Sequence, residues 1–370
     1  MKYPYLRPIL PQPETWVPLL ETSYSQRYFS NYGPLATRLE GRMTENYLIE
    51  GYSSTLVTSN TLGIQAVLNA LEVYGRYVIL PDFTFSGTLQ AVIAAGGKPI
   101  VCDVLKETSE LDPKSVEAAL EKYDDVAAIM HVRCYGFVND ITPVKKISKA
   151  HGIPLVIDAA AALSKPSEQT FGSEYGEIEI FSLHATKVFA IGEGGLIAAP
   201  EQISERIRRS VNFGFQSDRT FHDGTNAKMD EFRAAIGFGT LDLIDGIVDN
   251  RQKHASLYLE LFEGNDFVEL FDMPELASWS CFPILVPESN REKCITVFAD
   301  QGVEVKKYYW PSLSVGYQGR AKLEIMPVET SLLLQNSVMC LPIYSESPDD
   351  FWTGLSQAVR KSLQLLDSTR

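Results

Sequence analysis

The sequence predicts an α/β protein in which a mainly parallel β-sheet is covered by helices on both faces. Between about residues 55 and 200, short apolar runs alternate with segments of helical periodicity, as in layered α/β folds. The apolar runs are hydrophobic throughout, which is typical of strands that are buried on both faces. After about residue 265 this alternation stops, and the remaining segments predict a smaller α+β region.

Predicted strands and helices alternate in the first half of the chain. The helices are recognised by apolar side chains three and four residues apart, first over residues 61–74 and then around 89–93, where Gly96-Gly97 ends the helix. Each strand is a short apolar run between turn signals. We predict strands at residues 77–80, 99–104, 126–131, 155–158, 178–182 and 196–199.

Two further helices have clear N-terminal signals. Asp112-Pro113 and Thr142-Pro143 each combine a residue that can cap a helix with proline at the first helical position. We therefore expect Asp112 and Thr142 to be the capping residues. The second of these helices is expected to end at Gly152.

The alternation of strands and helices stops in the second half of the chain, and this change of pattern predicts two domains. We expect a large α/β domain over residues 1–250, which includes an N-terminal arm of residues 1–30, and a small α+β domain over residues 251–370. Residues 229–262 are expected to be helical, with a break or close packing at their glycines. They are followed by apolar stretches at 267–271 and 280–286, a helix at 291–301 and a last helix from Ser347-Pro348 onward.

The composition excludes several classes of function. The chain has 370 residues, and its 33 Lys and Arg against 47 Asp and Glu give a net charge of −14. Nucleic acids and anionic membranes select basic surfaces, so we expect neither as a partner. No apolar run is long enough to span a bilayer, and the N-terminus lacks the apolar core of a signal peptide. The five cysteines are too scattered for a disulfide framework or a metal site, which favours a cytoplasmic protein without a bound metal.

Candidate functional residues lie where the predicted strands end. In open parallel sheets, ligands bind beyond the carboxyl ends of the strands. The polar residues that come directly after, or at the end of, an apolar run are Asp82, His131, Asp158 and Ser182. We therefore expect the site among these positions and the loops that follow them.

One lysine has an unusual setting. Lys187 ends the segment Ser-Leu-His-Ala-Thr-Lys that follows a predicted strand, and a glycine-rich turn over residues 191–195 comes next. A lysine just beyond a buried strand, beside a turn that lets backbone approach closely, suits a Schiff-base nucleophile. On this spacing alone, a solvated loop lysine is the commoner alternative.

Three more features complete a set of binding groups. Asp158 can pair with a ring nitrogen or cap a helix, and residues 58–61 (Thr-Ser-Asn-Thr) can bind a phosphate at a helix start or simply cap it. Phe85 can stack on a ligand or pack in the core. Together with Lys187 these groups provide what a pyridoxal 5′-phosphate (PLP) site requires: a carboxylate, a phosphate cradle, an aromatic ring and an amine.

The order of these motifs resembles the DegT/DnrJ/EryC1/StrS family of PLP-dependent sugar aminotransferases, which have the aspartate-aminotransferase (type I) fold. The resemblance runs from about Tyr28 to the C-terminus. Its most specific stretches are Asp158-Ala159-Ala160, residues 182–187 with 193–195, and residues 224–231, and looser matches lie at 31–34, 81–85, 131–136 and 341–344. This agreement in order favours the nucleophile over the loop-lysine alternative.

The resemblance implies a role for the residues around the cofactor ring. Lys187 would hold the cofactor as the internal aldimine and later move a proton between the substrate carbon and the cofactor. Asp158 would pair with the pyridinium nitrogen and keep it protonated. Phe85 would stack on the ring. Ala161 stands where the family usually has Gln or His beside the cofactor, so one polar contact of the family is missing here.

The resemblance also implies residues that bind the phosphate and the substrate. Asn60, Thr61 and Ser182 match phosphate ligands, the first two chiefly through their backbone. Asn226 matches a residue that reaches the phosphate from the neighbouring subunit, which implies a homodimer with shared active sites. Lys228 falls where the family has a basic residue near the substrate.

Two further positions bear on which branch of the family the chain resembles. Residues 308–312, Tyr-Tyr-Trp-Pro-Ser, keep the aromatic-proline character of the family but lack the histidine that often follows, which predicts unusual substrate recognition. Lys187 argues against the dehydrase branch, in which histidine replaces the lysine.

The resemblance implies a PLP-dependent aminotransferase. An amino donor, expected to be L-glutamate, gives up its amino group, and a keto sugar attached to a nucleotide accepts it. The product would be an amino sugar for a surface polysaccharide, such as O-antigen, or for a glycosylated natural product. Two alternatives remain open: another PLP reaction on the same fold, either sugar dehydration or transamination of a substrate without a nucleotide, and a non-catalytic PLP-binding regulatory protein.

Overall fold

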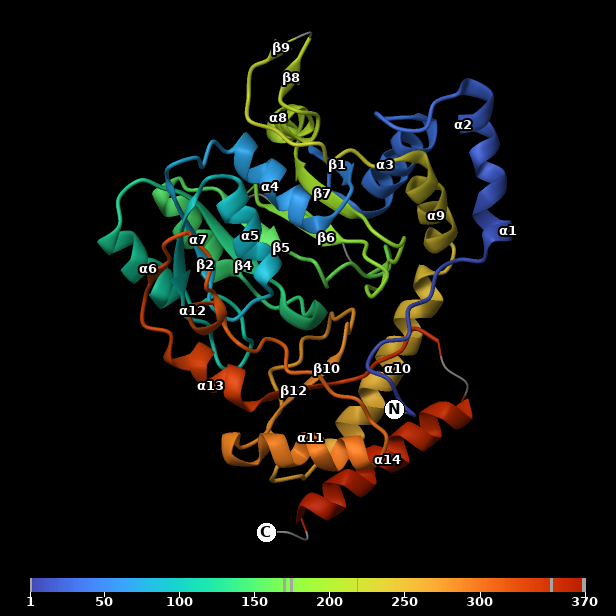
Figure 1. Cartoon of the computed structure of the whole chain (residues 1–370), viewed down its shortest axis with the longest axis vertical. Helices are drawn as coiled ribbons and strands as arrows, with labels where there is room; N and C mark the ends of the chain where they lie inside the picture. The colour runs from blue at the N-terminus through green and yellow to red at the C-terminus, as the bar shows by residue number, and fades with distance from the viewer. Residues whose placement is uncertain (1, 169–170, 174–175, 218, 347–348, 368–370) are drawn as a thin grey trace.

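The structure, a computed structural model, describes the whole chain except residues 1, 169–170, 174–175, 218, 347–348 and 368–370. An eight-stranded sheet lies at the centre of its larger part, in the order β1-β7-β6-β5-β4-β2-β3-β11 (Figure 1). The strands are β1 (Tyr52–Val57), β2 (Tyr77–Pro81), β3 (Lys98–Cys102), β4 (Val126–Val132), β5 (Leu155–Asp158), β6 (Ile178–Ser182), β7 (Gly195–Pro200) and β11 (Glu324–Ile325).

The sheet is mainly parallel, as the sequence predicts. All strand pairs from β6 to β11 in this order are parallel, whereas β7 is antiparallel to both β6 and β1. The sequence patterns did not predict β1 or β11. Most of β1 is polar (Tyr-Ser-Ser-Thr-Leu-Val) and β11 has only two residues, so neither edge strand forms an apolar run of its own.

Helices cover both faces of the sheet and divide the core into two layers. One layer packs against α4 (Asn60–Ala70), α5 (Ser86–Ala94) and α8 (Glu201–Val211). The other layer contains α3 (Pro34–Tyr47), α6 (Pro113–Lys122), α7 (Thr142–His151) and α9 (Glu231–Leu241). Buried strands with apolar side chains on both faces require this arrangement.

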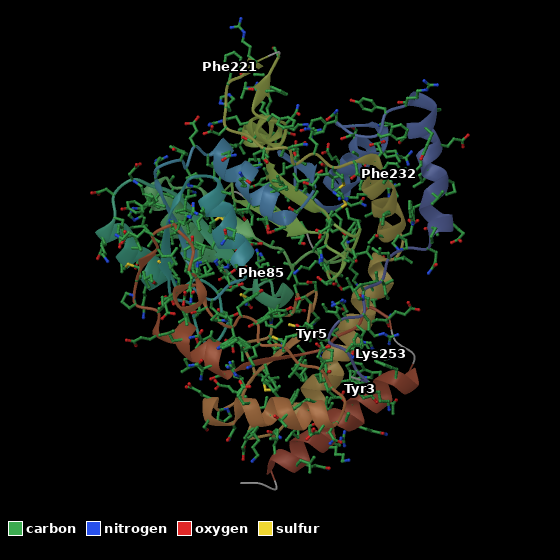
Figure 2. All side chains as sticks on the ribbon, in the orientation of Figure 1. Tyr3, Tyr5, Phe85, Phe221, Phe232 and Lys253 are labelled. Carbon is green, nitrogen blue, oxygen red and sulfur yellow. The ribbon has the colours of Figure 1, made fainter. Side chains whose placement is uncertain are left out.

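A third core lies in the lower part of Figure 1, around the two-stranded antiparallel sheet of β10 and β12. Its elements are α10 (Ile244–Phe262), β10 (Phe282–Leu285), α11 (Arg291–Asp300), α13 (Glu329–Ser337), β12 (Val338–Leu341) and α14 (Asp349–Asp367). Tyr3 and Tyr5 are buried in the same core, and Figure 2 shows both beside α10. We propose the domain division within α10, which contains residue 250.

Short elements complete the chain. They are α1 (Pro13–Trp16), η1 (Val17–Leu20), α2 (Glu21–Gln26), η2 (Cys134–Gly136), β8 (Phe215–Gln216), β9 (Arg219–Thr220), η3 (Glu288–Asn290) and α12 (Leu313–Gly316). The hairpin of β8 and β9 projects from the body of the molecule at the top of Figure 1. Among the described helices, none has the length and apolar character to cross a bilayer.

The helix starts expected from the sequence have different outcomes. Asp112 caps α6, and its Oδ1 accepts a hydrogen bond from Lys114 N at 2.9 Å, which confirms the prediction. The expectation for Thr142 was wrong. Thr142 is the first residue of α7, and its N–H donates to Asp140 Oδ1 at 2.9 Å. The N-cap residue of α7 is Ile141, which has no capping side chain, and the Asp140 carboxylate accepts the first N–H of the helix.

The helical region predicted over residues 229–262 has the break that the sequence analysis allowed for, although the break does not fall at a glycine, and α13 was not predicted. The predicted helix over residues 229–262 is two helices, α9 and α10, separated at residues 242–243. Close packing accounts for two of its glycines: a Cβ on Gly237 would lie 2.5 Å from Leu39 Cδ2, and one on Gly239 would lie 2.7 Å from Pro11 Cβ. The expected start of the last helix at Ser347-Pro348 lies outside the described residues.

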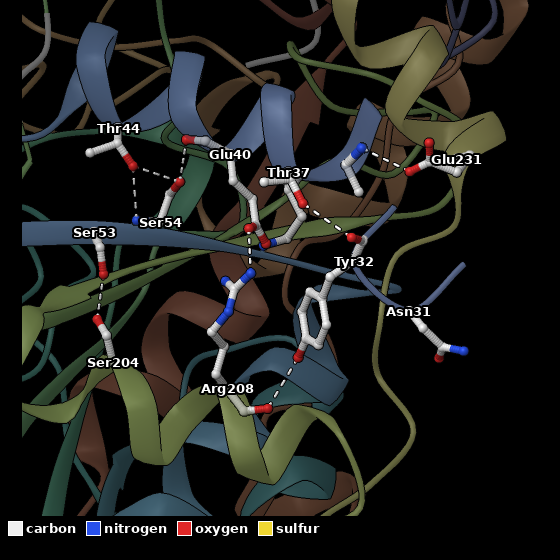
Figure 3. Close-up of polar contacts among 12 residues, drawn as sticks. Asn31, Tyr32, Thr37, Glu40, Thr44, Ser53, Ser54, Ser204, Arg208 and Glu231 are labelled. Atoms are coloured by element: carbon white, nitrogen blue, oxygen red, sulfur yellow. Dashed lines mark hydrogen bonds and ion pairs between the residues drawn. The ribbon is translucent and has the colours of Figure 1, made fainter. Parts of the chain in front are cut away.

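The buried carboxylates of Glu231 and Glu40 connect α3 to its neighbouring elements, and Figure 3 shows both residues. Glu231 accepts hydrogen bonds from Leu35 N at 2.8 Å and Ala36 N at 2.9 Å, so it caps α3 from a distant part of the sequence. Glu40 accepts from Leu56 N at 2.9 Å and pairs with Arg208 at 2.7 Å, which joins α3, β1 and α8. These contacts fix the position of β1, the strand that leads into the start of α4.

Candidate active site

A cavity of about 490 Å³ lies at the carboxyl ends of β2, β4, β5 and β6. This is the edge of the sheet at which the sequence predicts a site. Seven of the nine site residues expected from the sequence line this cavity, which we call the cofactor cavity: Asn60, Thr61, Phe85, Asp158, Ala161, Ser182 and Lys187.

Asp158, the last residue of β5, is only 5% exposed and has three hydrogen-bond donors. Thr88 Oγ1 donates to its Oδ2 at 2.6 Å, and Asn60 Nδ2 and Ala160 N donate to its Oδ1 at 3.3 and 3.2 Å. Burial raises the pKa of this carboxyl group, and the three hydrogen bonds oppose that rise. The result is a carboxylate with a fixed orientation at the cavity wall.

Lys187 lies in the loop after β6, and backbone hydrogen bonds hold this loop in a compact form. Ala185 N donates to Gly192 O at 2.7 Å, and Lys187 N donates to His184 O at 2.9 Å. Burial lowers the pKa of the Lys187 amine, against the opposing charge of Asp158. The neutral amine is the nucleophilic form, so the cavity favours the state that can condense with an aldehyde.

The N-terminus of α4 forms one end of the cavity. Ser59 Oγ caps the helix by accepting from Leu62 N at 3.3 Å, while the N–H groups of Asn60 and Thr61 lie in the first turn, where a helix offers no internal acceptor. A Cβ on Gly195 would lie 2.8 Å from Asn60 N, so only glycine lets β7 approach this helix start. Free N–H groups and the helix dipole make this end suitable for a phosphate.

The Asn60 side chain has a role that the sequence did not indicate. Its amide donates to Asp158 Oδ1 and also to Ile180 O at 3.1 Å. Only the backbone of Asn60 is therefore available to an anion at the helix start. Thr88, the other side chain that donates to Asp158, was missed because it lies 70 residues away in the sequence.

The cavity has the groups that PLP requires. An amine, a buried carboxylate and a helix N-terminus with hydroxyl groups beside it match the aldehyde, the ring nitrogen and the phosphate of that cofactor. Phe85 also lines the cavity, and it is 60% exposed, so its ring face is available for stacking. The residues present therefore fit this cofactor.

Two of the expected residues lie elsewhere. Lys228 Nζ donates to Asn226 Oδ1 at 2.7 Å and lies 4.3 Å from the centre of the Phe213 ring. Both belong to the segment after the β8–β9 hairpin, Asn226 is exposed, and neither lines the cofactor cavity of the same chain.

Two of the strand-end candidates are also outside the cavity. His131 is buried within β4, with Nε2 3.6 Å from Glu110 Oε1. Asp82 accepts hydrogen bonds from Ser314 N at 2.6 Å and from Ser314 Oγ at 2.9 Å. Asp82 therefore holds another segment of the chain in place.

Arg133 lines the cavity although the sequence analysis did not single it out. It is 7% exposed, and its nearest charged partner is Glu179, with Nε 3.6 Å from Oε2. Within the described residues, its Nε and Nη1 have no hydrogen-bond partner. The signal that could have identified it is an arginine directly after the apolar run of β4, at the carboxyl end of a buried strand. A buried guanidinium whose N–H groups lack acceptors is costly, which makes such a residue a candidate for binding a ligand.

Comparison with known proteins gives consistent results. The model of the DegT/DnrJ/EryC1/StrS aminotransferase family matches residues 15–359. The dTDP-4-amino-4,6-dideoxy-D-glucose transaminase of Shigella dysenteriae is 27% identical over 363 residues, which are 96% of this chain and 97% of that protein. The 3-oxo-glucose-6-phosphate:glutamate aminotransferase of Bacillus subtilis is 26% identical, over 90% of this chain and 77% of that protein.

A solved structure shares the fold over almost the whole chain. The structure of DesI in the presence of its TDP-sugar product superposes on this chain with a TM-score of 0.84 and 26% sequence identity. The superposition includes 98% of this chain and 94% of the DesI chain.

Proposed function

The chain belongs to the DegT/DnrJ/EryC1/StrS aminotransferase family, and on this premise we propose that it moves an amino group from L-glutamate to a nucleotide-linked keto sugar. It is a PLP-dependent aminotransferase with the fold of that enzyme class, and its relatives are sugar transaminases. The observation that carries the proposal is the placement of Lys187 and Asp158 in one cavity, beside the N-terminus of α4.

Each group in the cavity has a proposed task. Lys187 Nζ binds the cofactor and then moves a proton at the substrate carbon, for which its lowered pKa suits it. Asp158, oriented by Thr88 and Asn60, accepts a hydrogen bond from the ring nitrogen. The N-terminus of α4 and the Ser182 hydroxyl bind the phosphate. PLP, when bound, supplies an electron sink for the carbanion chemistry of transamination.

The names of the relatives support the substrates. The Shigella relative is named for a dTDP-linked amino sugar, and DesI was solved with a TDP-sugar product. The Bacillus subtilis relative is named for glutamate as its second substrate. A nucleotide-linked keto sugar as acceptor and L-glutamate as donor agree with these names, and the amino sugar would serve in polysaccharide or natural-product synthesis.

We also propose that the active form is a homodimer. Asn226 is exposed and does not line the cavity of its own chain, as expected for a residue that serves a partner subunit. Aromatic side chains nearby are exposed to solvent: Phe213 and Phe215 by 44% each and Phe221 by 59%. Figure 2 shows Phe221 near the tip of the projecting hairpin. A second copy that covers this side would bury these rings.

The proposed location is the cytoplasm. All five cysteines are buried free thiols, which is usual for proteins of a reducing compartment. Cysteines that face an oxidising compartment are commonly paired in disulfides.

A two-stage reaction tests the proposed function. Holoenzyme mixed with L-glutamate in the absence of an acceptor should form one equivalent of 2-oxoglutarate per active site. Addition of dTDP-4-keto-6-deoxy-D-glucose should then give the dTDP-linked amino sugar, detected by mass spectrometry.

The alternatives give different results in this test. Bound PLP without any 2-oxoglutarate would contradict the proposal and favour a regulatory PLP-binding protein. Formation of 2-oxoglutarate without transfer to any nucleotide sugar, but with transfer to a free or phosphorylated keto sugar, would favour an acceptor without a nucleotide.

A further inference from the structure

Arg133 is a buried cation in the wall of the cofactor cavity, and part of its hydrogen-bonding capacity is unused. It lies directly after β4, and its N–H donates to Asp158 O, at the end of β5, at 3.0 Å. Its side chain is 7% exposed, and its Nε and Nη1 have no hydrogen-bond partner within the described residues. A guanidinium has five N–H donors, and burying them without acceptors is costly.

Glu179, on β6, balances the charge of Arg133 but leaves its donors free. The distance from Arg133 Nε to Glu179 Oε2 is 3.6 Å, which is longer than a hydrogen bond, and this oxygen has no hydrogen-bond partner in the described chain either. The neighbouring charges of Glu177 and Lys145 pair with each other. A second anionic oxygen can therefore bind to the guanidinium of Arg133.

The order of the strands indicates which anionic oxygen this is. Along the sheet, β7 and β6 lie on one side of β5, and β4 lies on the other side (Figure 1). The groups suited to a phosphate are on the β7–β6 side, because the start of α4 packs against Gly195 of β7, and Ser182 ends β6. Asp158 ends β5 between the two sides, and Arg133 follows β4 on the other.

PLP carries its polar groups in a matching order. Its ring nitrogen lies opposite the carbon that bears the aldehyde, and the phosphate arm and the phenolate oxygen are on opposite sides of the line that joins these two ring positions. When the ring nitrogen faces Asp158 and the phosphate lies at the start of α4, the phenolate oxygen faces the β4 side. Arg133 is the cation on that side of Asp158.

The lining of the cavity offers Arg133 for this charge. Among the described lining residues, Lys187 is the other lysine or arginine, and it is already assigned to the aldehyde. The hydroxyl group of Tyr135, two residues after Arg133, donates to Tyr308 O at 2.7 Å. Ala161 also lines the cavity but has no side-chain donor.

We propose that Arg133 binds the phenolate oxygen of PLP through its unpaired N–H groups. Hydrogen bonds between a guanidinium and an anionic oxygen are charge-assisted and strong. The cation also makes the bound cofactor lose more easily the proton that the phenolate oxygen shares with the nitrogen of Lys187, because the charge that remains is stabilised. This inference rests on the proposed function, from which it takes the positions of the aldehyde, the ring nitrogen and the phosphate.

The test is a pH titration of the visible absorbance of the holoenzyme in the absence of substrates. In Arg133→Gln the midpoint should move to higher pH by about 1 to 3 pH units, since a cation beside the phenolate oxygen is lost. Arg133→Lys keeps the charge and should have a midpoint close to that of the unchanged protein. Glu179→Gln is the matched control. It removes the ion-pair partner and leaves the guanidinium, so its midpoint should stay the same or move to lower pH.

The variants separate a contact with the cofactor from a purely structural ion pair. An unchanged midpoint in Arg133→Gln would overturn the inference. Equal upward shifts in Arg133→Gln and Glu179→Gln would overturn it as well, because the pair would then act only through the fold. If Arg133→Gln does not retain the cofactor, Glu179→Gln decides: an upward shift contradicts the inference, and an unchanged or lower midpoint supports it.

The amino donor is another source of an anionic oxygen, because L-glutamate has two carboxylates. Glutarate has the same two carboxylates without the amino group, and its Kd can be measured on the holoenzyme by calorimetry. An arginine that binds the donor would give a higher Kd for glutarate in Arg133→Gln and an unchanged titration midpoint. That result would assign Arg133 to the donor and overturn its assignment to the phenolate oxygen.

Failure of this inference is distinct from failure of the proposed function. A holoenzyme whose titration midpoint depends on Arg133, but which forms no 2-oxoglutarate from L-glutamate, would uphold the contact with the cofactor and overturn the proposed reaction. A protein that aminates the nucleotide sugar while its midpoint is insensitive to Arg133→Gln would do the reverse.

Discussion

Two neighbouring cavities of the molecule are constructed differently: the cofactor cavity, and a cavity of about 470 Å³ lined by residues between 84 and 90 and between 308 and 319, which we call the aromatic cavity. The cofactor cavity takes its groups from the ends of several strands and from a helix start, and its key side chains are buried and held by hydrogen bonds. The aromatic cavity takes most of its wall from residues 308–319, a segment of loops around the short helix α12, and two of its rings, Phe85 and Trp310, are more than half exposed. The first is part of the sheet, whereas the second is attached to it by a few side-chain contacts.

This difference separates the chemistry from the recognition of the substrate. Strand ends in a buried sheet cannot shift without loss of core packing, so groups placed there keep their geometry. A loop wall can change its residues without a change of fold, and loops are where binding specificity commonly resides. Changes in the cofactor cavity should therefore affect the rate of chemistry, and changes around the aromatic cavity should affect substrate affinity.

The largest effect is expected at Lys187. Lys187→Ala removes the amine that binds the cofactor and moves the proton, so 2-oxoglutarate formation from L-glutamate should fall by at least about 10²- to 10⁴-fold. The visible absorbance of bound cofactor should change as well. Lys165→Ala is a suitable control, because Lys165 pairs with Asp249 at 2.6 Å and does not line the cavity. Equal rates in the two variants would contradict the proposed role.

The next largest effect is expected at Asp158. Asp158→Asn keeps the size of the side chain but removes the charge that would face the ring nitrogen. The cofactor should remain bound after dialysis, while the single-turnover rate with L-glutamate should fall by about 10²- to 10³-fold. An unchanged rate would show that this carboxylate has no part in the chemistry.

The sequence predicted most of the cofactor cavity because its residues sit at the ends of readable patterns. Asp158 and Ser182 end apolar runs, Lys187 follows one, and Thr61 begins a helix whose apolar face is periodic. In a parallel sheet, such strand ends come together at one edge whatever the details of the loops. Local periodicity therefore placed Asp158 and Ser182 at one edge of the sheet, but it also selected His131 and Asp82, which lie outside the cavity. The preference for Lys187 as a nucleophile over a loop lysine came from the family resemblance.

The contacts that orient these residues could not be predicted in the same way. Thr88 meets Asp158 across 70 residues, and Asp82 meets Ser314 across 232. Neither contact has a periodic signal, and each depends on how separate elements pack. Thr142 shows the same limit at short range, since α7 begins at Thr142 itself and the first N–H of the helix is bound by the Asp140 carboxylate.

A smaller effect is expected where Thr88 orients Asp158. Its hydrogen bond lowers the pKa of the Asp158 carboxyl group, which burial raises. In Thr88→Val that pKa should rise further, so the acid limb of the kcat/KM profile should move to higher pH, with a loss of about tenfold on that limb. Thr88→Ser keeps a hydroxyl group and should restore the profile. A shift in the opposite direction, or none, would exclude this role.

The smallest effect is expected at Asp82, which holds the wall of the aromatic cavity. Asp82→Asn can no longer accept both hydrogen bonds from Ser314, so the wall should lose part of its fixed position. The KM for the nucleotide sugar should rise by about 2- to 12-fold, as expected for one net hydrogen bond, with kcat little changed.

Asp103 provides the matched control for Asp82. Asp103 also accepts hydrogen bonds across the chain, from Thr330 N at 2.9 Å and Ser331 N at 2.8 Å, but these hold the start of α13 and not the aromatic wall. Asp103→Asn should lower the melting temperature without a specific rise in KM. If both variants raise KM equally, Asp82 acts only through the general stability of the fold. The proposed separation between chemistry in the cofactor cavity and substrate recognition in the aromatic cavity would then fail at this contact.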